Sequence, residues 1–550
     1  MAEALHGIGV SAGFAAGPVH RLAPPPDLPV PAPVADIEAE ITRAAGALAT
    51  VAADLKRRAA AAGGPAAEIL SAQAMMADDP VLPDAVADAV RGGDDAAHAI
   101  DHALAAHRRA FEAAGGYLAE RVADLDDLRD RAVAVCLGQP MPGIPDPGYP
   151  FVLAARDLAP ADTAGLDPAS VLALVTEAGG PTSHTAIVAR SLGLPAVVRC
   201  EGVLTLHDGV MVAVDGATGQ VEVDPDSATV RERREREIGR RAAIARSAGP
   251  GRTADGHAVA LLANIGSAGD LTGEGGAGAE GVGLFRTELL YLDRATAPTL
   301  AEQVVTYTEV FAAAAGRRMV IRTLDAGADK PLPFVHHDVE PNPALGVRGL
   351  RLAWRHPDVL DTQLAAIAEA ARATGADAWV MAPMVATAAE AADFVGRCRA
   401  VGLPRAGVMV EIPAAALRAA ALVQVVDFLS IGTNDLSQYT FAADRQCGEL
   451  AELLDPWQPV LLQLIDACAV AGREAGRPVG VCGEAAADPA LSLVLVGLGI
   501  TSLSMSPRSI PAVREALSAH TLAECRALAE AALAAPDAMA ARAEAIGRRS

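Results

Sequence analysis

Short apolar segments alternate with helical segments throughout the second half of the chain. Each apolar segment has the length of a β-strand, and the stretches between them carry apolar residues at helical spacing. Eight strands separated by helices are typical of a (β/α)8 barrel, and residues 251–550 have about the length that such a barrel needs. The predicted strands are VALLANI from residue 259, GVGLF from 281, MVIRTL from 319, WVMAPM from 379, AGVMVE from 406, DFLSIG from 427, VGVCG from 479 and SLSMS from 502.

The first half of the chain has a different pattern. Residues 36–135 have helical periodicity without strand alternation, which predicts a helical bundle. Strand patterns lie on both sides of it, in GIGVSAGFAAGPVH before and in YPFVLAARDL, VLALVT and DGVMVAVDG after. We therefore expect one small α/β domain, made of residues 1–35 and 136–225, with the bundle inserted. The highly charged residues 226–250 are expected to form a solvent-exposed linker helix. The predicted fold class is multidomain α/β.

Composition and charge exclude several classes of protein. A chain of 550 residues is too long for one core, and 51% hydrophobic with 21% charged residues is typical of a globular protein. A net charge of −23 argues against nucleic-acid binding, because no basic stripe is present. Seven cysteines without a CxxC pair favour a reduced cytoplasm. The N-terminus lacks the pattern of a signal peptide, and the longest apolar run, PALSLVLVGLGITSLSMSP, is interrupted by Gly, Ser, Thr and Pro.

Polar residues follow five of the predicted barrel strands, at the point where each strand ends. The C-terminal ends of barrel strands carry the active site in this fold, and loop polarity alone does not explain charged or reactive groups at five of them. These residues are Arg286, Glu288, Arg322, Asp325, Glu411, Asn434, Asp435, Cys482 and Glu484, with Lys330 and Arg445 a little further along the chain.

The residue types at this rim indicate a substrate with several negative charges. Arg286, Arg322 and Arg445 suit phosphate and carboxylate groups, because guanidinium binds both in a bidentate manner. Glu411 and Asp435 are hard oxygen ligands, and two carboxylates with substrate oxygens are a usual way to hold Mg2+. The alternative is that these carboxylates simply pair with the arginines. Cys482, similarly, is either a buried core thiol or a proton donor to a carbanion.

A histidine in the first half is the candidate nucleophile. In GGPTSHTAIVAR, Thr182 or Ser183 can cap a helix that begins near His184. The positive end of a helix keeps an imidazole neutral and stabilises a phosphoryl group attached to it. A lone histidine before an apolar helix is more often structural. The hydroxyls, the two glycines and the anion rim elsewhere favour a phosphorylated nucleophile.

Seven long motifs, spread over nearly the whole chain, carry a family resemblance. They are GGPTSHTAIVARSLGLPAV, AEGVGLFRTELLYLDR, VIRTLDAGADKPLP, NPALGVRGLR, GVMVEIPAAAL, VDFLSIGTNDLSQYTFAADR and VGVCGEAAADP. The chain thereby resembles the Enzyme I family of the bacterial phosphotransferase system, the phosphoenolpyruvate–protein phosphotransferases.

The resemblance implies a reaction and a site. Phosphoenolpyruvate would phosphorylate His184, and the phosphoryl group would pass to a histidine of the carrier protein HPr, with release of pyruvate, as the first step of sugar uptake. Cys482 would protonate the enolate of pyruvate. The matching substrate residues are Arg286, Arg322, Asn434, Asp435 and Arg445, and the matching Mg2+ ligands are Glu411 and Asp435. The bundle would dock HPr, the phosphohistidine domain would swivel, and the barrel would form a homodimer.

Two alternative functions compete with this one, and the sequence differs from the family pattern at two places. A pyruvate dikinase or phosphoenolpyruvate synthase would need an ATP-binding domain ahead of the histidine, and a non-catalytic phosphorelay scaffold would lack rim residues. Gln73 stands where many members have histidine, and Trp457, Gln458 and Pro459 replace a common His-Pro pair. The sequence predicts no additional N-terminal sensory domain, which favours sugar uptake over nitrogen regulation.

Overall fold

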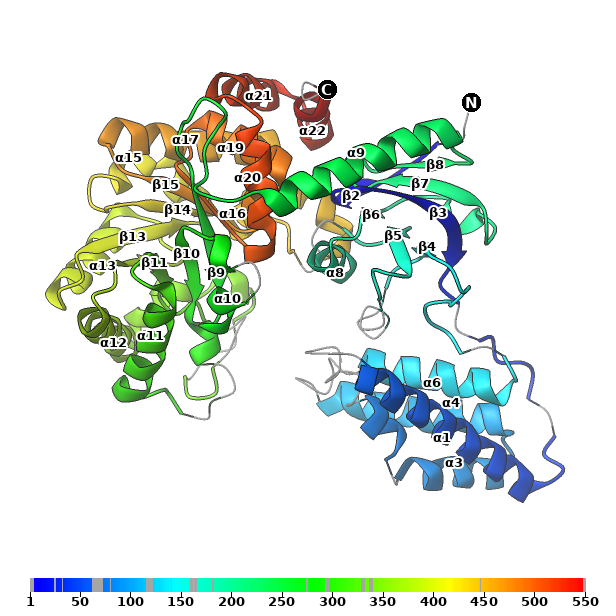
Figure 1. Cartoon of the computed structure of the whole chain (residues 1–550). Coiled ribbons are helices and arrows are strands. Elements are labelled where there is room, and N and C mark those ends of the chain that lie inside the picture. Colours follow the sequence, from blue (N-terminus) through cyan, green and yellow to red (C-terminus); the bar gives the residue numbers. More distant parts are fainter. Residues whose placement is uncertain are drawn as a thin grey trace. The chain divides into compact units, whose positions relative to one another are not determined.

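The computed structural model separates the chain into two compact units, residues 1–237 and 238–550 (Figure 1). Each unit has its own buried core. The structure describes residues 4–23, 26–31, 33–61, 73–79, 81–114, 122–139, 141–158, 162, 166–180, 183–273, 276–291, 294, 296–327, 332–335, 340–445 and 447–547.

An eight-stranded sheet forms the α/β part of the N-terminal unit. Its strand order is β1-β8-β7-β3-β4-β5-β6-β2. Strands from before and after residues 37–136 therefore share one sheet, with β4 parallel to β3 and β5. The strands are β1 (Ala4–His6), β2 (Ile8–Ser11), β3 (Phe14–Arg21), β4 (Phe151–Ala155), β5 (Val171–Thr176), β6 (Ala196–Val198), β7 (Met211–Asp215) and β8 (Gln220–Val223).

Alternation along the strands divides the core of this sheet into two layers. In β4, Phe151 and Leu153 join one buried cluster, whereas Val152 and Ala154 join the other. This follows from the two-residue period of a strand that is covered on both faces. Helix α8 (His184–Leu192) packs Ala186 and Ala189 into the first cluster and connects β5 to β6.

A helical bundle stands between β3 and β4 in the sequence. Its helices are α1 (Ile37–Ala61), α3 (Val81–Arg91), α4 (Ala96–Ala114) and α6 (Val122–Cys136). Apolar residues at helical spacing, such as Leu48, Val51 and Leu55 of α1, form one buried cluster. Gln73 is also buried, at 1% exposure, and its Nε2 donates to Asp124 at 3.3 Å. The glutamine therefore serves the packing of the bundle.

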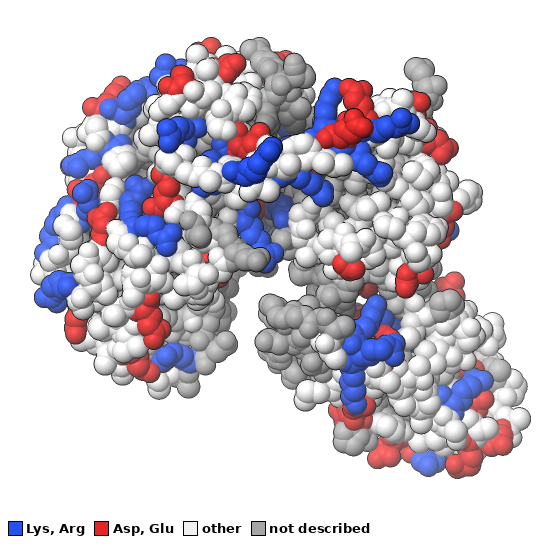
Figure 2. Space-filling view, viewed as in Figure 1, with Lys and Arg blue, Asp and Glu red and all other residues white. Residues whose placement is uncertain are grey.

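The charged segment is the single helix α9 (Ser227–Arg246). Figure 2 shows basic and acidic side chains mixed along it. Arg236 donates to Glu232 one turn earlier at 2.7 Å, and Arg234 Nη2 donates to the carbonyl of Ala16 at 2.9 Å. The prediction of a largely solvent-exposed charged helix is confirmed. Among the described residues, no helix combines the length and apolarity that crossing a membrane requires.

The C-terminal unit contains a closed barrel of eight parallel strands, as the sequence predicted. β16 pairs with β9 and closes the ring. The strands are β9 (Ala260–Ile265), β10 (Gly281–Arg286), β11 (Arg318–Arg322), β12 (Ala378–Ala382), β13 (Arg405–Val410), β14 (Leu429–Gly432), β15 (Val479–Cys482) and β16 (Ser502–Met505).

Helices surround the barrel and cover its outer face (Figure 1). Within β11, Met319 and Ile321 face the helices and Val320 faces the interior. The helices are α10 (Gly269–Thr272), α11 (Leu300–Ala314), α12 (Pro357–Thr374), α13 (Ala388–Ala400), α14 (Pro413–Leu417), α15 (Ala419–Leu422), α16 (Thr433–Phe441), α17 (Pro459–Ala475), α18 (Glu484–Ala487), α19 (Pro489–Leu498), α20 (Ile510–Ser518), α21 (Leu522–Ala534) and α22 (Ala538–Gly547).

Trp457, which lies where the family commonly has a His-Pro pair, has a structural role. Trp457 is fully buried, and its indole Nε1 donates to Asp488 at 3.1 Å. The guanidinium of Arg542 lies 5.8 Å from the centre of its ring. Pro459 begins α17, a position that proline favours because it needs no hydrogen-bond donor there. The tryptophan therefore anchors the start of α17.

Candidate active site

Helix α8 begins at His184. Ser183 is the N-cap residue, with extended backbone, and its Oγ accepts a hydrogen bond from the N–H of Ala186 at 3.3 Å. Gly193 ends the helix in the left-handed conformation, with φ of 67°. The predicted cap is therefore confirmed with Ser183, whereas Thr182 lies outside the described residues. The role of His184 remains a prediction.

The loop before α8 requires a glycine. Gly179 has φ of +92°, and a Cβ at this position would lie 3.2 Å from Ser183 Oγ. Thr185 Oγ1 donates to Asp157 at 3.0 Å, which ties the first turn of α8 to the segment after β4. The backbone N–H groups of this turn form the positive end of the helix, which favours an anion close to His184.

Five of the predicted site residues reach the same end of the barrel. Arg286, Arg322 and Cys482 are the last residues of β10, β11 and β15. Glu411 follows β13, and Asp435 lies in the first turn of α16 directly after β14. Because all eight strands are parallel, these positions meet at one rim. Asn434, next to Asp435, reaches toward Gly483, where an added Cβ would lie 3.3 Å from Asn434 Oδ1.

Arg445 and Lys330 are less well placed by the structure. Arg445 follows α16, and its backbone N–H donates to the side chain of Gln438 at 3.2 Å. Among the described residues, no contact places the guanidinium of Arg445 next to Arg286 or Arg322. Lys330 lies outside the described residues.

Arg322 lies between two carboxylates. Its Nη2 donates to Glu288 at 2.5 Å, and its Nη1 lies 3.4 Å from Asp325 Oδ2. Burial opposes the charge of Arg322, but the carboxylates of Glu288 and Asp325 outweigh it, so the guanidinium pKa is raised. Its Nε is buried without a hydrogen-bond partner among the described residues. A donor of this kind can still bind an anionic oxygen.

Arg348 extends this charged network, although the strand pattern did not single it out. It lies 2% exposed just before a 3-10 helix, Gly349–Trp354. Its Nη2 donates to Asp325 at 3.0 Å, and its Nη1 lies 3.7 Å from Asp435 Oδ1. Its presence in the motif NPALGVRGLR was the available signal. Its position in a loop, away from any strand end, explains why strand counting missed it.

Glu411 Oε2 and Asp435 Oδ1 at the rim are buried, and neither has a hydrogen-bond partner among the described residues. The other oxygen of Glu411 accepts from the N–H of Met384 at 2.5 Å. Burial, together with the nearby carboxylates of Asp325 and Asp435, raises the pKa of Glu411 to about 8, while Arg322 opposes the shift. A buried carboxylate oxygen without a donor fits a cation ligand.

The two carboxylates fit a hard divalent cation. No group of three or more His, Cys, Asp or Glu side chains with the arrangement of a metal site occurs within the described ranges. Two carboxylates alone would leave coordination positions for substrate oxygens and water, as is usual for Mg2+. Ion pairing with an arginine, the alternative, applies to Asp435, whose Oδ1 lies 3.7 Å from Arg348 Nη1. It leaves Glu411 Oε2 without a hydrogen-bond partner among the described residues.

The thiol of Cys482 is protonated and almost fully enclosed. It is 2% exposed, and its Sγ donates to the carbonyl of Ile431 at 3.4 Å. Ser430 Oγ donates to the same sulfur at 3.6 Å. Burial raises the pKa of this thiol, and Ser430, Arg322 and Arg286 counteract the shift only in part. The group therefore has a proton to donate at neutral pH.

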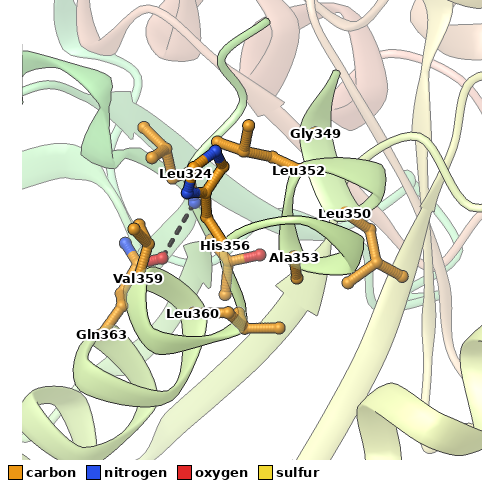
Figure 3. Close-up of a pocket in the computed structure, with 10 residues that line it drawn as sticks. Leu324, Gly349, Leu350, Leu352, Ala353, His356, Val359, Leu360 and Gln363 are labelled. Atoms are coloured by element: carbon orange, nitrogen blue, oxygen red, sulfur yellow. Dashed lines mark hydrogen bonds between the residues drawn. The ribbon is translucent and has the colours of Figure 1, made fainter. Parts of the chain in front are cut away.

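A buried glutamine holds the backbone of the two arginine strands in place. Gln363 of α12 accepts a hydrogen bond from the N–H of Leu324 at 2.9 Å, as the dashed line in Figure 3 shows. Its Nε2 donates to Thr287 Oγ1 at 3.1 Å and to Tyr307 at 3.0 Å. Thr287 in turn donates to the carbonyl of Arg322 at 2.9 Å. Gln363 thus connects the residue after Arg286 with the backbone on both sides of Thr323.

Sequence reasoning did not find Gln363. The residue is 0% exposed and belongs to a helix on the outer side of the barrel. A polar residue within an apolar helical stripe was the only available signal.

Comparison with known proteins gives a consistent result over the whole chain. Residues 242–522 match the family model described as PEP-utilising enzyme, PEP-binding domain. Residues 6–121 match PEP-utilising enzyme, N-terminal, and residues 148–219 match PEP-utilising enzyme, mobile domain.

Two curated relatives are similar along their full length. The phosphoenolpyruvate-protein phosphotransferase of Streptomyces coelicolor is 54% identical, with 98% of each chain covered. The protein of the same name from Haloferax volcanii is 41% identical, with 96% of each chain covered. A solved structure of an Enzyme I protein is 32% identical, covers 43% of this chain and 98% of its own, and has a TM-score of 0.39.

Proposed function

The chain belongs to the phosphoenolpyruvate–protein phosphotransferase family, and we propose that it transfers the phosphoryl group of phosphoenolpyruvate to its own His184 and then to a histidine of the carrier protein HPr. Pyruvate is the second product. The enzyme thereby performs the first step of sugar uptake. The observation that carries the assignment is the rim itself, where Arg322, the Glu411 oxygen without a donor and the protonated Cys482 thiol meet.

Each rim residue has a role that its chemistry supports. Arg286, Arg322 and Arg445, with Asn434, bind the phosphate and carboxylate of phosphoenolpyruvate, because guanidinium and amide groups donate to several oxygens at once. Glu411 and Asp435 would hold Mg2+, and the bound ion would supply positive charge to neutralise the phosphoryl group. Asp325 compensates the charge of Arg322 and Arg348 and orients both side chains toward the site.

The transfer has two chemical steps. The phosphorus–oxygen bond of phosphoenolpyruvate breaks while a bond forms between phosphorus and the imidazole nitrogen of His184 that is remote from the backbone. The leaving group is the enolate of pyruvate, whose negative charge the arginines stabilise. Cys482 then donates its proton to the methylene carbon of the enolate. Formation of the keto acid removes the enolate and favours the forward direction.

The proposal assigns roles to the other parts of the chain. Because His184 and the rim belong to different units, the transfer needs a rigid-body movement, and α9 is the proposed linker for it. The helical bundle is the proposed HPr-docking part, and the barrel is the proposed site of homodimerisation. Gln73 is buried, so its replacement of histidine acts through the packing of the bundle rather than by touching the carrier.

The test is phosphoryl labelling. The full chain is incubated with labelled phosphoenolpyruvate and Mg2+, with and without HPr. Wild type is expected to gain acid-labile, base-stable label and to pass it to HPr with release of pyruvate, while His184→Ala gains none. His207→Ala, an exposed histidine of the same unit, is the matched control and keeps the label.

Two other outcomes would change the assignment. Label that requires ATP would place the chain with the pyruvate dikinases. No label from either donor would leave a binding scaffold without turnover, and the proposed transfer would be wrong.

A further inference from the structure

A small hollow with both apolar and polar lining residues lies inside the barrel beneath Cys482. Gly480 lines it and stands two residues before Cys482 in β15, so the two positions face the same side of that strand. Ser430, Ser502 and Ser504 bring hydroxyl groups to the same hollow. Arg318 and Pro478, at the beginning of β11 and just before β15, place its other end at the N-terminal side of the barrel.

Small residues at inward positions create this hollow. The interior of an eight-stranded barrel is normally filled with side chains. Here Ser430, Gly480 and Ser502 pair with one another across β14, β15 and β16 and form one level of the interior. A Cβ at Gly480 would lie 2.4 Å from Ser502 Oγ, and one at Gly283 would lie 2.4 Å from Ser504 Oγ. On the opposite side of the interior, large apolar side chains such as Met381 and Met409 fill the space.

The hollow has the size that water requires, and polar residues form part of its lining. The volume that the centre of a water molecule can occupy in the hollow is about 20 Å3. A volume of about 10–15 Å3 of this kind is enough for one water. Arg318 lines the hollow, and its Nη2 is buried and has no hydrogen-bond partner among the described residues. A buried donor of this kind requires an acceptor. One or two waters between Arg318 and the serine hydroxyls would supply it.

Ser430 connects the hollow to the thiol. It is one of the residues lining the hollow, and its Oγ donates to Cys482 Sγ at 3.6 Å. The proton of Cys482 is directed away from Ser430, toward the carbonyl of Ile431. The serine hydroxyl therefore already presents its hydrogen to the sulfur. It remains able to accept a hydrogen bond from a water in the hollow.

We propose that Ser430 and the water of this hollow return a proton to Cys482 after it has protonated the enolate. The proposal rests on the proposed function, in which Cys482 loses its proton once per phosphoryl transfer. The rim side of the thiol is then covered by product, and only 2% of Cys482 is exposed. Ser430 is a positioning and relay residue that acts through Cys482.

The relay balances in protons and electrons. The Cys482 S–H bond breaks as the new C–H bond of pyruvate forms, and the electron pair stays on sulfur. The Ser430 O–H bond then breaks as a new S–H bond forms. Water in the hollow gives a proton to the serine oxygen and becomes hydroxide. Bulk water at the N-terminal end of the barrel returns a proton to this hydroxide, so the negative charge that leaves sulfur ends on hydroxide in bulk solvent. Water is the only additional reactant.

An isotope experiment separates the relay from phosphoryl transfer. The full chain with Mg2+, phosphoenolpyruvate and carbon-13 pyruvate in heavy water exchanges carbon between the two acids. This exchange needs no solvent proton, because the thiol loses a proton in one direction and regains it from the methyl group in the other. Deuterium enters pyruvate only when the thiol exchanges with solvent. The measured quantity is deuterium gained per carbon exchanged, by mass spectrometry, with an enzyme-free control for spontaneous exchange.

The expected result is selective. Ser430→Ala keeps the carbon exchange and lowers deuterium per carbon exchanged by about tenfold or more, the usual size of a proton-transfer contribution. Ser430→Thr, which keeps the hydroxyl, restores the ratio. Ser492→Ala is the matched control, because this buried serine of α19 donates to Pro489 and does not touch Cys482. It is expected to change neither quantity.

Each contrary result identifies what has failed. An unchanged ratio in Ser430→Ala overturns the relay and leaves the proposed function intact. Carbon exchange that persists in Cys482→Ala shows that another group is the acid, which also overturns the relay. Absence of carbon exchange in wild type overturns the proposed function itself.

Discussion

Asp325 Oδ2 accepts a hydrogen bond from Arg348 Nη2 at 3.0 Å, and both side chains are at most 2% exposed. The same oxygen lies 3.4 Å from Arg322 Nη1. One buried carboxylate thus serves two guanidinium groups at the rim, so its removal would leave positive charge in the barrel interior with less compensation.

Asp325→Ala is expected to destabilise the C-terminal unit strongly. Breaking a buried ion pair from one side costs about 3–5 kcal/mol, because the remaining charge loses its partner. Urea unfolding measures the change. Asp361→Ala removes an exposed partner of Arg397, and it is expected to cost less than about 1 kcal/mol. Equal effects of the two substitutions would mean that Asp325 does not compensate the rim arginines.

Gly432→Ala is expected to weaken the metal site without unfolding the barrel. A Cβ at Gly432 would lie 3.3 Å from Glu411 Oε2 and 3.1 Å from Met409 Sδ. The methyl group would displace Glu411 Oε2, which has no hydrogen-bond partner among the described residues. Mg2+ affinity, measured by calorimetry in the presence of phosphoenolpyruvate, is expected to fall about tenfold or more, since metal sites tolerate only about 0.5 Å of displacement.

The control for Gly432→Ala is Gly396→Ala in α13, where an added Cβ meets nothing within 4 Å. Alanine is a better helix former than glycine, so this variant should gain about 0.5–1 kcal/mol of stability with unchanged Mg2+ binding. Unaltered Mg2+ affinity in Gly432→Ala would contradict the assignment of Glu411 as a ligand.

Gln363→Ala is expected to slow phosphorylation by phosphoenolpyruvate. The substitution removes the hydrogen bonds to Leu324 N and Thr287 Oγ1, and with them the support of the backbone that carries Arg322. A misplacement of about 1 Å at a substrate-binding group can cost about a hundredfold in rate, so a loss of at least about tenfold is expected. Rapid quench of the label measures it.

Gln303→Ala provides the matched comparison. Gln303 is a second buried glutamine in the same region, and it bonds to Tyr291 at 2.9 Å and to the carbonyl of Pro298 at 3.0 Å. Its loss should lower stability by about 1–3 kcal/mol and leave the phosphorylation rate of the folded enzyme unchanged. If both variants slow phosphorylation equally, the effect of Gln363 is on general stability.

Ser183→Ala is expected to destabilise the N-terminal unit and to slow phosphorylation of His184. Loss of an N-cap serine costs about 1 kcal/mol, and fraying of the first turn of α8 would release His184 from the positive helix end. Thr299→Ala removes a cap of the same kind from α11 in the other unit. It should cost a similar free energy there without affecting the label on His184, measured by quench under conditions where both units are folded.

The buried thiol of Cys398 is expected to limit stability at alkaline pH. Burial raises its pKa from 9.0 to about 12. Above pH 9 the unfolded thiol ionises while the folded thiol keeps its proton, so its contribution is complete below pH 9. The contribution is lost between pH 9 and 12, by at most about 1.4 kcal/mol per pH unit.

Urea unfolding at pH 8, 9 and 10.5 measures this loss. The stability difference between wild type and Cys398→Ala should shrink or reverse as pH rises. The corresponding difference for Ser492→Ala, a buried group that does not titrate, should stay constant. A constant difference for Cys398→Ala would show that the thiol ionises in the folded protein as easily as in the unfolded one.

Periodicity and local motifs were sufficient for the barrel, whereas the strand patterns of the first half did not include β1, β6 and β8 of the eight-stranded sheet. Short apolar segments separated the barrel strands from the helices, and all eight barrel strands lie where the pattern predicted them. Ser183 caps α8 because capping depends only on neighbours along the chain. The rim positions of Arg286, Arg322 and Cys482 also followed from sequence, because parallel strands of a barrel end on one side.

Only the tertiary structure revealed the contacts between segments distant in sequence. Arg348 lies in a loop, and its partners Asp325 and Asp435 are 23 and 87 positions away, so no local spacing relates them. Gln363 reaches the arginine strands from an outer helix. The hollow beneath Cys482 arises because Gly480, Ser430 and Ser502 come level across three strands, and that register is fixed by closure of the barrel. Chain connectivity determines which elements form, whereas packing determines which side chains meet.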